Sequence, residues 1–163
     1  MKNITNEFLI KKALSAVNPK KSATGRLFGD VGAALVTDKG NIYCGTCFDT
    51  QEGNTLCAER SAMAAMITAG ETKIKKIVAI WTNGEIIPPC GACREWLWQI
   101  DKDNWNTEVI IGKNKSITLK DLLPHHWHNL ETKGKKLKID IKELVHKINK
   151  EVFDEVNKRR NQS

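Results

Sequence analysis

The sequence predicts an α/β domain, in which helices and strands alternate along the chain and pack as layers. Segments with helical spacing or a helix-forming composition are separated by short apolar runs that are typical of buried strands. The chain has 163 residues, 40% of them hydrophobic, which is enough for one domain with a packed core. The pattern changes after His128, so we expect a domain over residues 1–128 and a separate extension over 129–163.

The first three elements follow from apolar spacing and from turn signals. A helix is expected over residues 4–17, and Asn18-Pro19 ends it because the residue before a proline avoids helical geometry. Residues 20–30 are expected to form a loop. The apolar runs 31–37 and 42–48 flank a polar turn, which predicts a β-hairpin.

The second half of the domain continues the alternation. A buried helix is expected over residues 58–69, which contain no Gly or Pro and almost no charge after Arg60, and Gly70 is a natural stop. The remaining elements, in chain order, are a strand over 76–82, a helix over 92–100, strands over 107–111 and 116–119, and a helical turn over 119–123 closed by Pro124.

The C-terminal extension is expected to be a basic linker followed by an amphipathic helix, whose apolar face runs from Ile141 to Val156. The formal net charge is +7, and residues 129–163 hold 10 basic and 6 acidic residues, so the main body needs no nucleic-acid surface. The polar face of the helix carries glutamates as well as lysines. We therefore expect it to pack on the domain or on a partner subunit rather than on a membrane or nucleic acid.

Cysteine usage indicates a reduced, cytoplasmic protein. The five cysteines are an odd number, and the only apolar run near the start, Phe8-Leu9-Ile10, is too short for a secretory signal. No segment approaches the roughly 18 apolar residues of a membrane span. Metal-binding or catalytic thiols are therefore a better interpretation than a disulfide framework.

Two motifs carry the chemistry, and each begins a helix. They are Cys57-Ala58-Glu59-Arg60 and Pro89-Cys90-Gly91-Ala92-Cys93-Arg94. A ligand beside a carboxylate, followed by Pro-Cys-x-x-Cys, is the signature of zinc-dependent deaminases in a three-cysteine form. The spacing leaves room for one strand between the motifs, so both can meet at one site.

Three thiolates, from Cys57, Cys90 and Cys93, leave one tetrahedral zinc position for water, whose pKa the metal lowers towards about 7. Glu59 is the expected proton shuttle. Zinc with three thiolates has a net charge of −1, so Arg60 and Arg94 are expected to hydrogen-bond the sulfurs and offset that charge.

The short separation within the first motif imposes a condition on the site. Residues 57 and 59 would point to opposite sides of a regular helix, so Cys57 must lie at or before the first turn. Two other interpretations remain: the cysteines only pack, or a structural zinc site recruits Cys44 or Cys47 as a fourth ligand. We expect Cys44 to pack, whereas Cys47 could line a pocket.

The motifs resemble the cytidine deaminase family, in its free-nucleoside branch with three cysteine ligands. The resemblance runs from about Phe28 to Trp127. It rests on Val31-Gly32-Ala33-Ala34-Leu35, Cys57-Ala58-Glu59-Arg60, Pro89-Cys90-Gly91-Ala92-Cys93-Arg94 and Leu122-Leu123-Pro124. It implies a three-layer α/β/α sandwich around a five-strand mixed sheet, and a homotetramer whose neighbouring subunits complete each active site.

The resemblance also implies substrate contacts. Trp127 holds the place of an aromatic residue that borders the pocket, and Ala58 is expected to contact the substrate. The family's ribose-binding Asn-x-Glu corresponds here to Cys47-Phe48-Asp49. Where the family carries a Phe, two residues before its Val-Gly-Ala-Ala run, this chain has Gly29 with Phe28 beside it.

We therefore expect zinc-dependent hydrolytic deamination of a cytosine-type nucleoside, cytidine or deoxycytidine, to the uracil product and ammonia, as in pyrimidine salvage. One alternative is another amino-heterocycle, either a blasticidin-like nucleoside with a modified sugar or a base in RNA. A second is a non-enzymatic zinc-stabilised module that binds nucleic acid. Glu59 separates enzyme from module, because a structural zinc site needs no proton shuttle.

Overall fold

The computed structural model describes residues 4–50, 55–127, 146–147 and 149–150, and its contacts divide the chain into Met1–Trp127 and His128–Ser163. The elements of the first unit are α1 (Asn6–Ser15), β1 (Lys20–Lys21), β2 (Leu27–Thr37), β3 (Ile42–Phe48), α2 (Ala58–Thr68), β4 (Ile74–Trp81), β5 (Ile86–Ile87), α3 (Gly91–Ile100), the 3₁₀-helix η1 (Lys102–Asn106), β6 (Glu108–Gly112), β7 (Lys115–Thr118) and α4 (Leu119–Leu122). The alternation of helices and strands confirms the predicted α/β class.

In the second unit, residues 146–147 and 149–150 are helical. The rest of the amphipathic helix expected there lies outside the described residues. No helix in the described ranges is long and apolar enough to cross a membrane.

The sheet has seven strands in the order β1-β2-β4-β6-β7, with β3 paired to β2 and β5 to β4. It is mixed, because β4 and β6 run parallel while the other pairs are antiparallel. The five strands that the family resemblance implies are those of four or more residues. The two additional strands, β1 and β5, have two residues each and carry no apolar pattern that the sequence analysis could detect.

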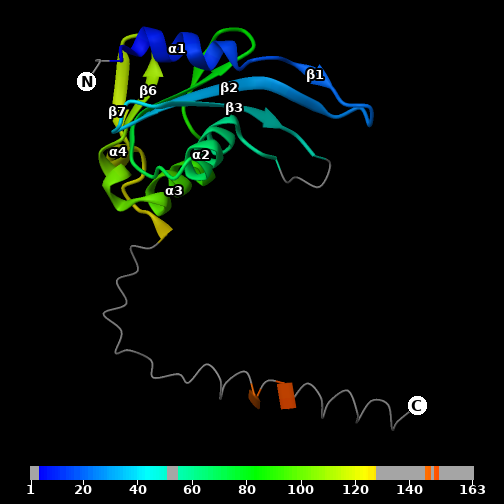
Figure 1. Cartoon of the computed structure of the whole chain (residues 1–163), viewed down its shortest axis with the longest axis vertical. Coiled ribbons are helices and arrows are strands. Elements are labelled where there is room, and N and C mark those ends of the chain that lie inside the picture. Colours follow the sequence, from blue (N-terminus) through cyan, green and yellow to red (C-terminus); the bar gives the residue numbers. More distant parts are fainter. Residues whose placement is uncertain (1–3, 51–54, 128–145, 148, 151–163) are drawn as a thin grey trace. The chain divides into compact units, whose positions relative to one another are not determined.

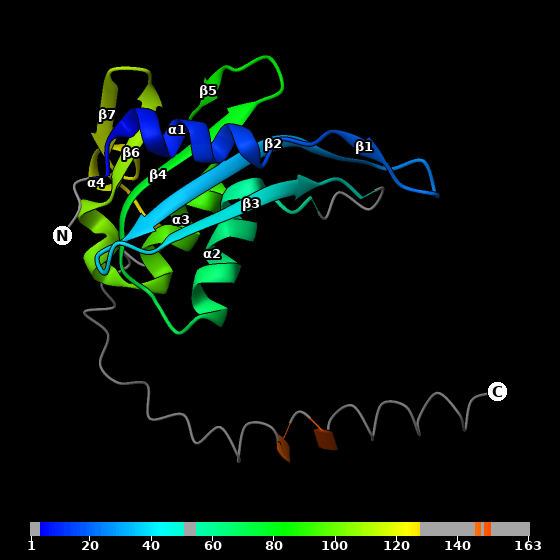
Figure 2. The same cartoon turned by 45° about the horizontal axis from the view of Figure 1, so that its top comes forward.

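The helices form a layer on each face of the sheet (Figure 1). Helix α1 lies on one side, and α2 and α3 lie on the other, as the turned view also shows (Figure 2). Along β2, Ala34 and Val36 belong to the core beneath α1, whereas Leu35 packs with Met63 of α2. This alternation follows from the period of two in a strand, and it produces the expected α/β/α sandwich.

Two glycines let the helices approach the sheet. A Cβ added at Gly32 of β2 would lie 2.3 Å from the carbonyl oxygen of Ala13 in α1. A Cβ at Gly45 of β3 would lie 2.3 Å from the amide nitrogen of Ala62 and 2.5 Å from the carbonyl oxygen of Ala58, both in α2. Real side-chain carbons do not come this close to backbone, so the position of α2, which begins next to Cys57, depends on Gly45.

We expect Gly45→Ala to destabilise the domain by about 2 kcal/mol or more, because the added methyl group meets rigid helix backbone. Thermal unfolding should show a Tm several degrees lower. Gly112→Ala is the matched control, since its Cβ would meet only the Lys115 Cβ at 3.4 Å. Equal Tm values for the two variants would contradict the role assigned to Gly45.

Candidate active site

The first turns of α2 and α3 bring the two motifs together. Cys57 is the N-cap of α2 and Cys90 the N-cap of α3, and both have extended backbone geometry, with φ/ψ of −61°/147° and −65°/168°. Cys57 thus precedes the first helical turn, which is the condition that the short spacing to Glu59 imposed. The partial positive charge of both helix N-termini favours thiolates at this place.

Three sulfur atoms converge at these helix ends. The Sγ of Cys90 lies 3.7 Å from that of Cys57 and 3.5 Å from that of Cys93, and all three lie within 4.8 Å of one another. Tetrahedral zinc with Zn–S bonds of about 2.3 Å holds its sulfurs about 3.8 Å apart. The thiols therefore fit a zinc ion. Burial raises the pKa of the Cys57 and Cys93 thiols, and the charge of a bound cation would offset that cost.

The other two cysteines lie elsewhere. Cys44 is exposed, and its thiol faces the carbonyl oxygen of Lys12 in α1, on the opposite side of the sheet. Cys47 is buried and donates a hydrogen bond to Asp30. Among the described residues, the group of possible metal ligands contains Cys57, Cys90 and Cys93 without a fourth member. This arrangement matches a catalytic zinc site, in which one position is left for water.

Glu59 lies in the first turn of α2 and is only 5% exposed. Burial raises the pKa of its carboxyl group, while the Cys93 thiol and the Arg60 charge oppose the shift. A carboxyl group with a raised pKa is suited to accepting and returning a proton near neutral pH. Glu59 lines the same pocket as Cys57 and Cys90.

The two arginines next to the ligands have different surroundings. Arg60 donates to the Thr55 carbonyl oxygen, its Nη2 lies 3.7 Å from the Cys57 Sγ, and its guanidinium lies 5.6 Å from the Trp96 ring centre. Arg94 donates instead to the carbonyl oxygens of Pro89 and Leu122, at 2.8 and 3.0 Å. Arg60 is thus placed to offset thiolate charge, whereas Arg94 connects the Cys90 loop to the end of α4.

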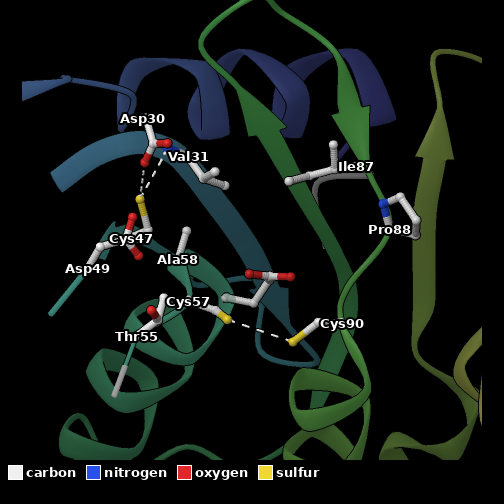
Figure 3. Close-up of a pocket in the computed structure, with 11 residues that line it drawn as sticks. Asp30, Val31, Cys47, Asp49, Thr55, Cys57, Ala58, Ile87, Pro88 and Cys90 are labelled. Atoms are coloured by element: carbon white, nitrogen blue, oxygen red, sulfur yellow. Dashed lines mark hydrogen bonds between the residues drawn. The ribbon is translucent and has the colours of Figure 1, made fainter. Parts of the chain in front are cut away.

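A pocket of about 190 Å³ opens beside the sulfurs. Figure 3 shows Cys57 and Cys90 at one end, Asp30, Cys47 and Asp49 at another, and Ile87 and Pro88 on a further wall. The pocket therefore combines ligand thiols, an apolar wall and a polar end. Its described lining consists of Asp30, Val31, Cys47, Asp49, Thr55, Cys57, Ala58, Glu59, Ile87, Pro88 and Cys90.

Three of the five expected substrate-binding residues, Cys47, Asp49 and Ala58, line this pocket. Phe28 does not; its ring packs against Phe48, with centroids 6.3 Å apart. Phe28 pairs with Phe48 in the strand register, and the β2–β3 register is irregular between Phe28 and Gly32. Within it, Gly29 has φ +82°, and a Cβ there would lie 2.1 Å from the Asn18 carbonyl oxygen. An aromatic residue at position 29 is therefore incompatible with this backbone.

Trp127 also lies outside the lining of the pocket within its own chain. Its side chain is 70% exposed, and its backbone nitrogen donates to the carboxylate of Glu95 at 2.8 Å. Trp127 is thus a surface residue of the described chain and is not part of the described lining of the pocket.

Sequence reasoning missed several lining residues. Ile87 and Pro88 directly precede the second motif, so their proximity could have been inferred from position alone. The sequence gives no sign that Asp30 lines the pocket, because the direction of its side chain depends on the irregular backbone around Gly29. Thr55 lies just before the first motif, in a segment expected to be a polar loop, and it accepts a hydrogen bond from Arg60.

Comparison with known proteins agrees with this geometry. A family model described as "Cytidine and deoxycytidylate deaminase zinc-binding region" matches residues 4–110. A cytidine deaminase of Halalkalibacterium halodurans is 30% identical over 123 residues, 72% of this chain and 90% of its own length. A blasticidin-S deaminase of Bacillus cereus is 28% identical over 103 residues, 58% of this chain and 74% of its own.

A solved structure gives the same fold. The crystal structure of cytidine deaminase from Mycobacterium tuberculosis superposes with a TM-score of 0.65 at 24% identity, covering 77% of this chain and 98% of that one. Fold and site together define a zinc-dependent aminohydrolase. The chain belongs to the cytidine and deoxycytidylate deaminase family.

We expect Arg60→Ala to lower zinc affinity or turnover by about 10- to 100-fold, because the Cys57 sulfur loses its cationic neighbour. The zinc affinity and turnover of Arg60→Lys should lie between those of the unaltered protein and Arg60→Ala, since an ammonium group keeps the charge but lacks the planar guanidinium. Zinc content under a graded chelator, together with kcat, provides the measurement. Arg94→Ala is the comparison and should lower Tm more than zinc affinity. Unchanged zinc retention and kcat in Arg60→Ala would refute this assignment.

Proposed function

We propose that this protein hydrolytically deaminates a cytosine-type nucleoside, such as cytidine or deoxycytidine, to the uracil nucleoside and ammonia. The observation that carries the proposal is a buried carboxyl group, Glu59, in one pocket with three thiols that fit zinc. A structural zinc site has no use for such an acid. The homology to cytidine deaminases supports the choice of ring.

The proposed reaction adds water to the ring carbon that bears the amine and then breaks the carbon–nitrogen bond. Zinc, when held by Cys57, Cys90 and Cys93, supplies the Lewis acid that activates the water. Glu59 takes a proton from the water and passes it to the ring nitrogen. It then takes the proton of the hydroxyl group formed by this addition and delivers it to the amine, so that the carbon–nitrogen bond breaks, the carbonyl of the uracil ring forms and ammonia leaves. The raised pKa of Glu59 suits both transfers.

The rest of the pocket positions the ring. Val31, Ala58, Ile87 and Pro88 offer an apolar wall for a flat heterocycle. Cys47 and Asp49 lie at the polar end, where the sugar of a nucleoside would extend away from the zinc. The ring of a nucleoside would thus contact the apolar wall, and its sugar would contact the polar end of the pocket.

We propose further that the enzyme works in the cytoplasm as a homotetramer, and that Trp127 of one subunit borders the pocket of another. The 70% exposure of this large apolar side chain supports the proposal. So does the family resemblance around Leu122-Leu123-Pro124.

Glu59→Gln tests the activity. It should lower kcat by about 10²- to 10⁴-fold, because the amide cannot relay protons, while zinc stays bound. Ammonia release from cytidine and elemental analysis for zinc give the two readouts. Removing zinc with a chelator should abolish turnover in the unaltered protein, and adding zinc back should restore it.

Glu7→Gln is the matched control, since Glu7 lies on α1, across the sheet from the pocket, with its side chain 74% exposed. It should retain full activity. Ammonia release by Glu59→Gln at the unaltered rate would exclude the proposed proton shuttle. Salt-sensitive RNA binding without turnover of any nucleoside would favour the non-enzymatic module.

The tetramer makes a separate prediction. Light scattering after gel filtration should give four times the mass of one chain. Trp127→Ala should raise KM more than it lowers kcat, because it removes a contact to the substrate rather than to the protons. A monomer with full activity would refute the shared active site.

A further inference from the structure

The end of the pocket away from the zinc ligands is acidic. Asp30 and Asp49 both line it, and both are half-buried. None of the described lining residues is a lysine or an arginine. Figure 3 shows Asp30, Cys47 and Asp49 together at this end, on the side of the pocket formed by β2 and β3. Two carboxylates thus face the space that the sugar of a nucleoside would fill.

A buried thiol holds one of these carboxylates in place. Cys47 is 5% exposed, and its Sγ donates to the Asp30 Oδ1 at 2.6 Å while accepting from the Val31 amide at 3.3 Å. Burial, and then the bond to Asp30, raise the pKa of this thiol, so it is neutral. The thiol proton is committed to Asp30 and is not available to a ligand.

The two carboxylates have no counter-ion among the described ion pairs. Those pairs join Lys11 to Glu7, Lys73 to Asp103 and Lys76 to Glu108. Arg26 lines a neighbouring hollow that shares Asp49, but the two side chains are not among these ion pairs. Within the described residues of one chain, no ion pair balances the negative charge at this end of the pocket.

An occupant is expected here, because the acidic residues share the pocket with the buried Glu59 and with the thiols that fit zinc. An ammonium group supplies hydrogen-bond donors and the missing positive charge. A neutral sugar supplies donors alone. A phosphate supplies acceptors and more negative charge, so two carboxylates would repel it.

We propose that Asp30 and Asp49 make this enzyme selective for cytosine nucleosides with a positively charged amine on the sugar, and that they exclude nucleotides. The inference rests on the proposed deamination and adds the substrate class. Asp30 is its specificity-determining residue. In place of an amide at position 47, this chain has a neutral thiol whose proton is held by that carboxylate.

The test compares kcat/KM of the full-length, zinc-loaded protein for four probes at low ionic strength. The probes are cytidine, 3′-amino-3′-deoxycytidine, 5′-amino-5′-deoxycytidine and cytidine 5′-monophosphate. We expect at least one amino analogue to exceed cytidine by tenfold or more, and the monophosphate to fall at least tenfold below it. The preference for the amine should shrink as salt is added, because salt screens the attraction.

Variants then assign the preference to its residues. Asp30→Asn removes the charge and keeps an oxygen that can accept from Cys47, so the ratio of kcat/KM for the amino analogue to that for cytidine should fall at least threefold. Asp49→Asn should act in the same direction. Asp38→Asn is the matched control, because Asp38 is exposed in the turn between β2 and β3 and does not line the pocket. It should leave the ratio unchanged.

Each remaining outcome is decisive. Cytidine turnover without preference for either amine overturns the inference and leaves the proposed function intact. Preference for the monophosphate, abolished by Arg26→Ala, overturns it in favour of a phosphate site. A ratio that is insensitive to Asp30→Asn and Asp49→Asn also overturns it. Failure to deaminate any of the four probes removes the proposed function and this inference with it.

Discussion

The site depends on close contact between helix backbone and sheet backbone. Helix α2 can lie against β3 only because Gly45 has no side chain. That contact sets the place where α2 begins, and so the positions of Cys57 and Glu59. Helix α3 begins at Gly91, directly after its N-cap Cys90, and brings the sulfurs of Cys90 and Cys93 to the same point. The metal centre is therefore a product of how two helices are seated on one sheet face.

The N-cap geometry of Cys57 explains how Cys57 and Glu59, two residues apart, can serve the same site. In a regular helix, a ligand and a proton shuttle two residues apart would point to opposite sides. Cys57 avoids this by having extended backbone, so its sulfur lies off the helix end while Glu59 remains in the first turn. The same arrangement leaves Glu59 buried, which raises its pKa. One local feature therefore supplies both a ligand and a tuned acid.

Sequence reasoning succeeded where chemistry is encoded locally. The motifs around Cys57 and Cys90 and the gap between them were enough to predict three converging thiols. The helix that ends before Gly70 was also predicted to within one residue. It did not anticipate the early start of β2 at Leu27 or the role of Asp30. The early start of β2 depends on its pairing with Lys20 and Lys21, and the position of Asp30 depends on the irregular β2–β3 register. Pairing and register join segments that are separate in the sequence, so local patterns do not reveal them.

The left-handed backbone at Gly29 limits which residues can occupy this position. A single substitution to an aromatic residue here meets both an unfavourable φ and the Asn18 carbonyl oxygen. Placing an aromatic ring at position 29 would therefore require the β2 register, and with it the Phe28–Phe48 pair, to change together with the side chain. Such coupled changes are epistatic. The residue at position 29 and the path of the adjoining strands are therefore coupled, and neither can change alone.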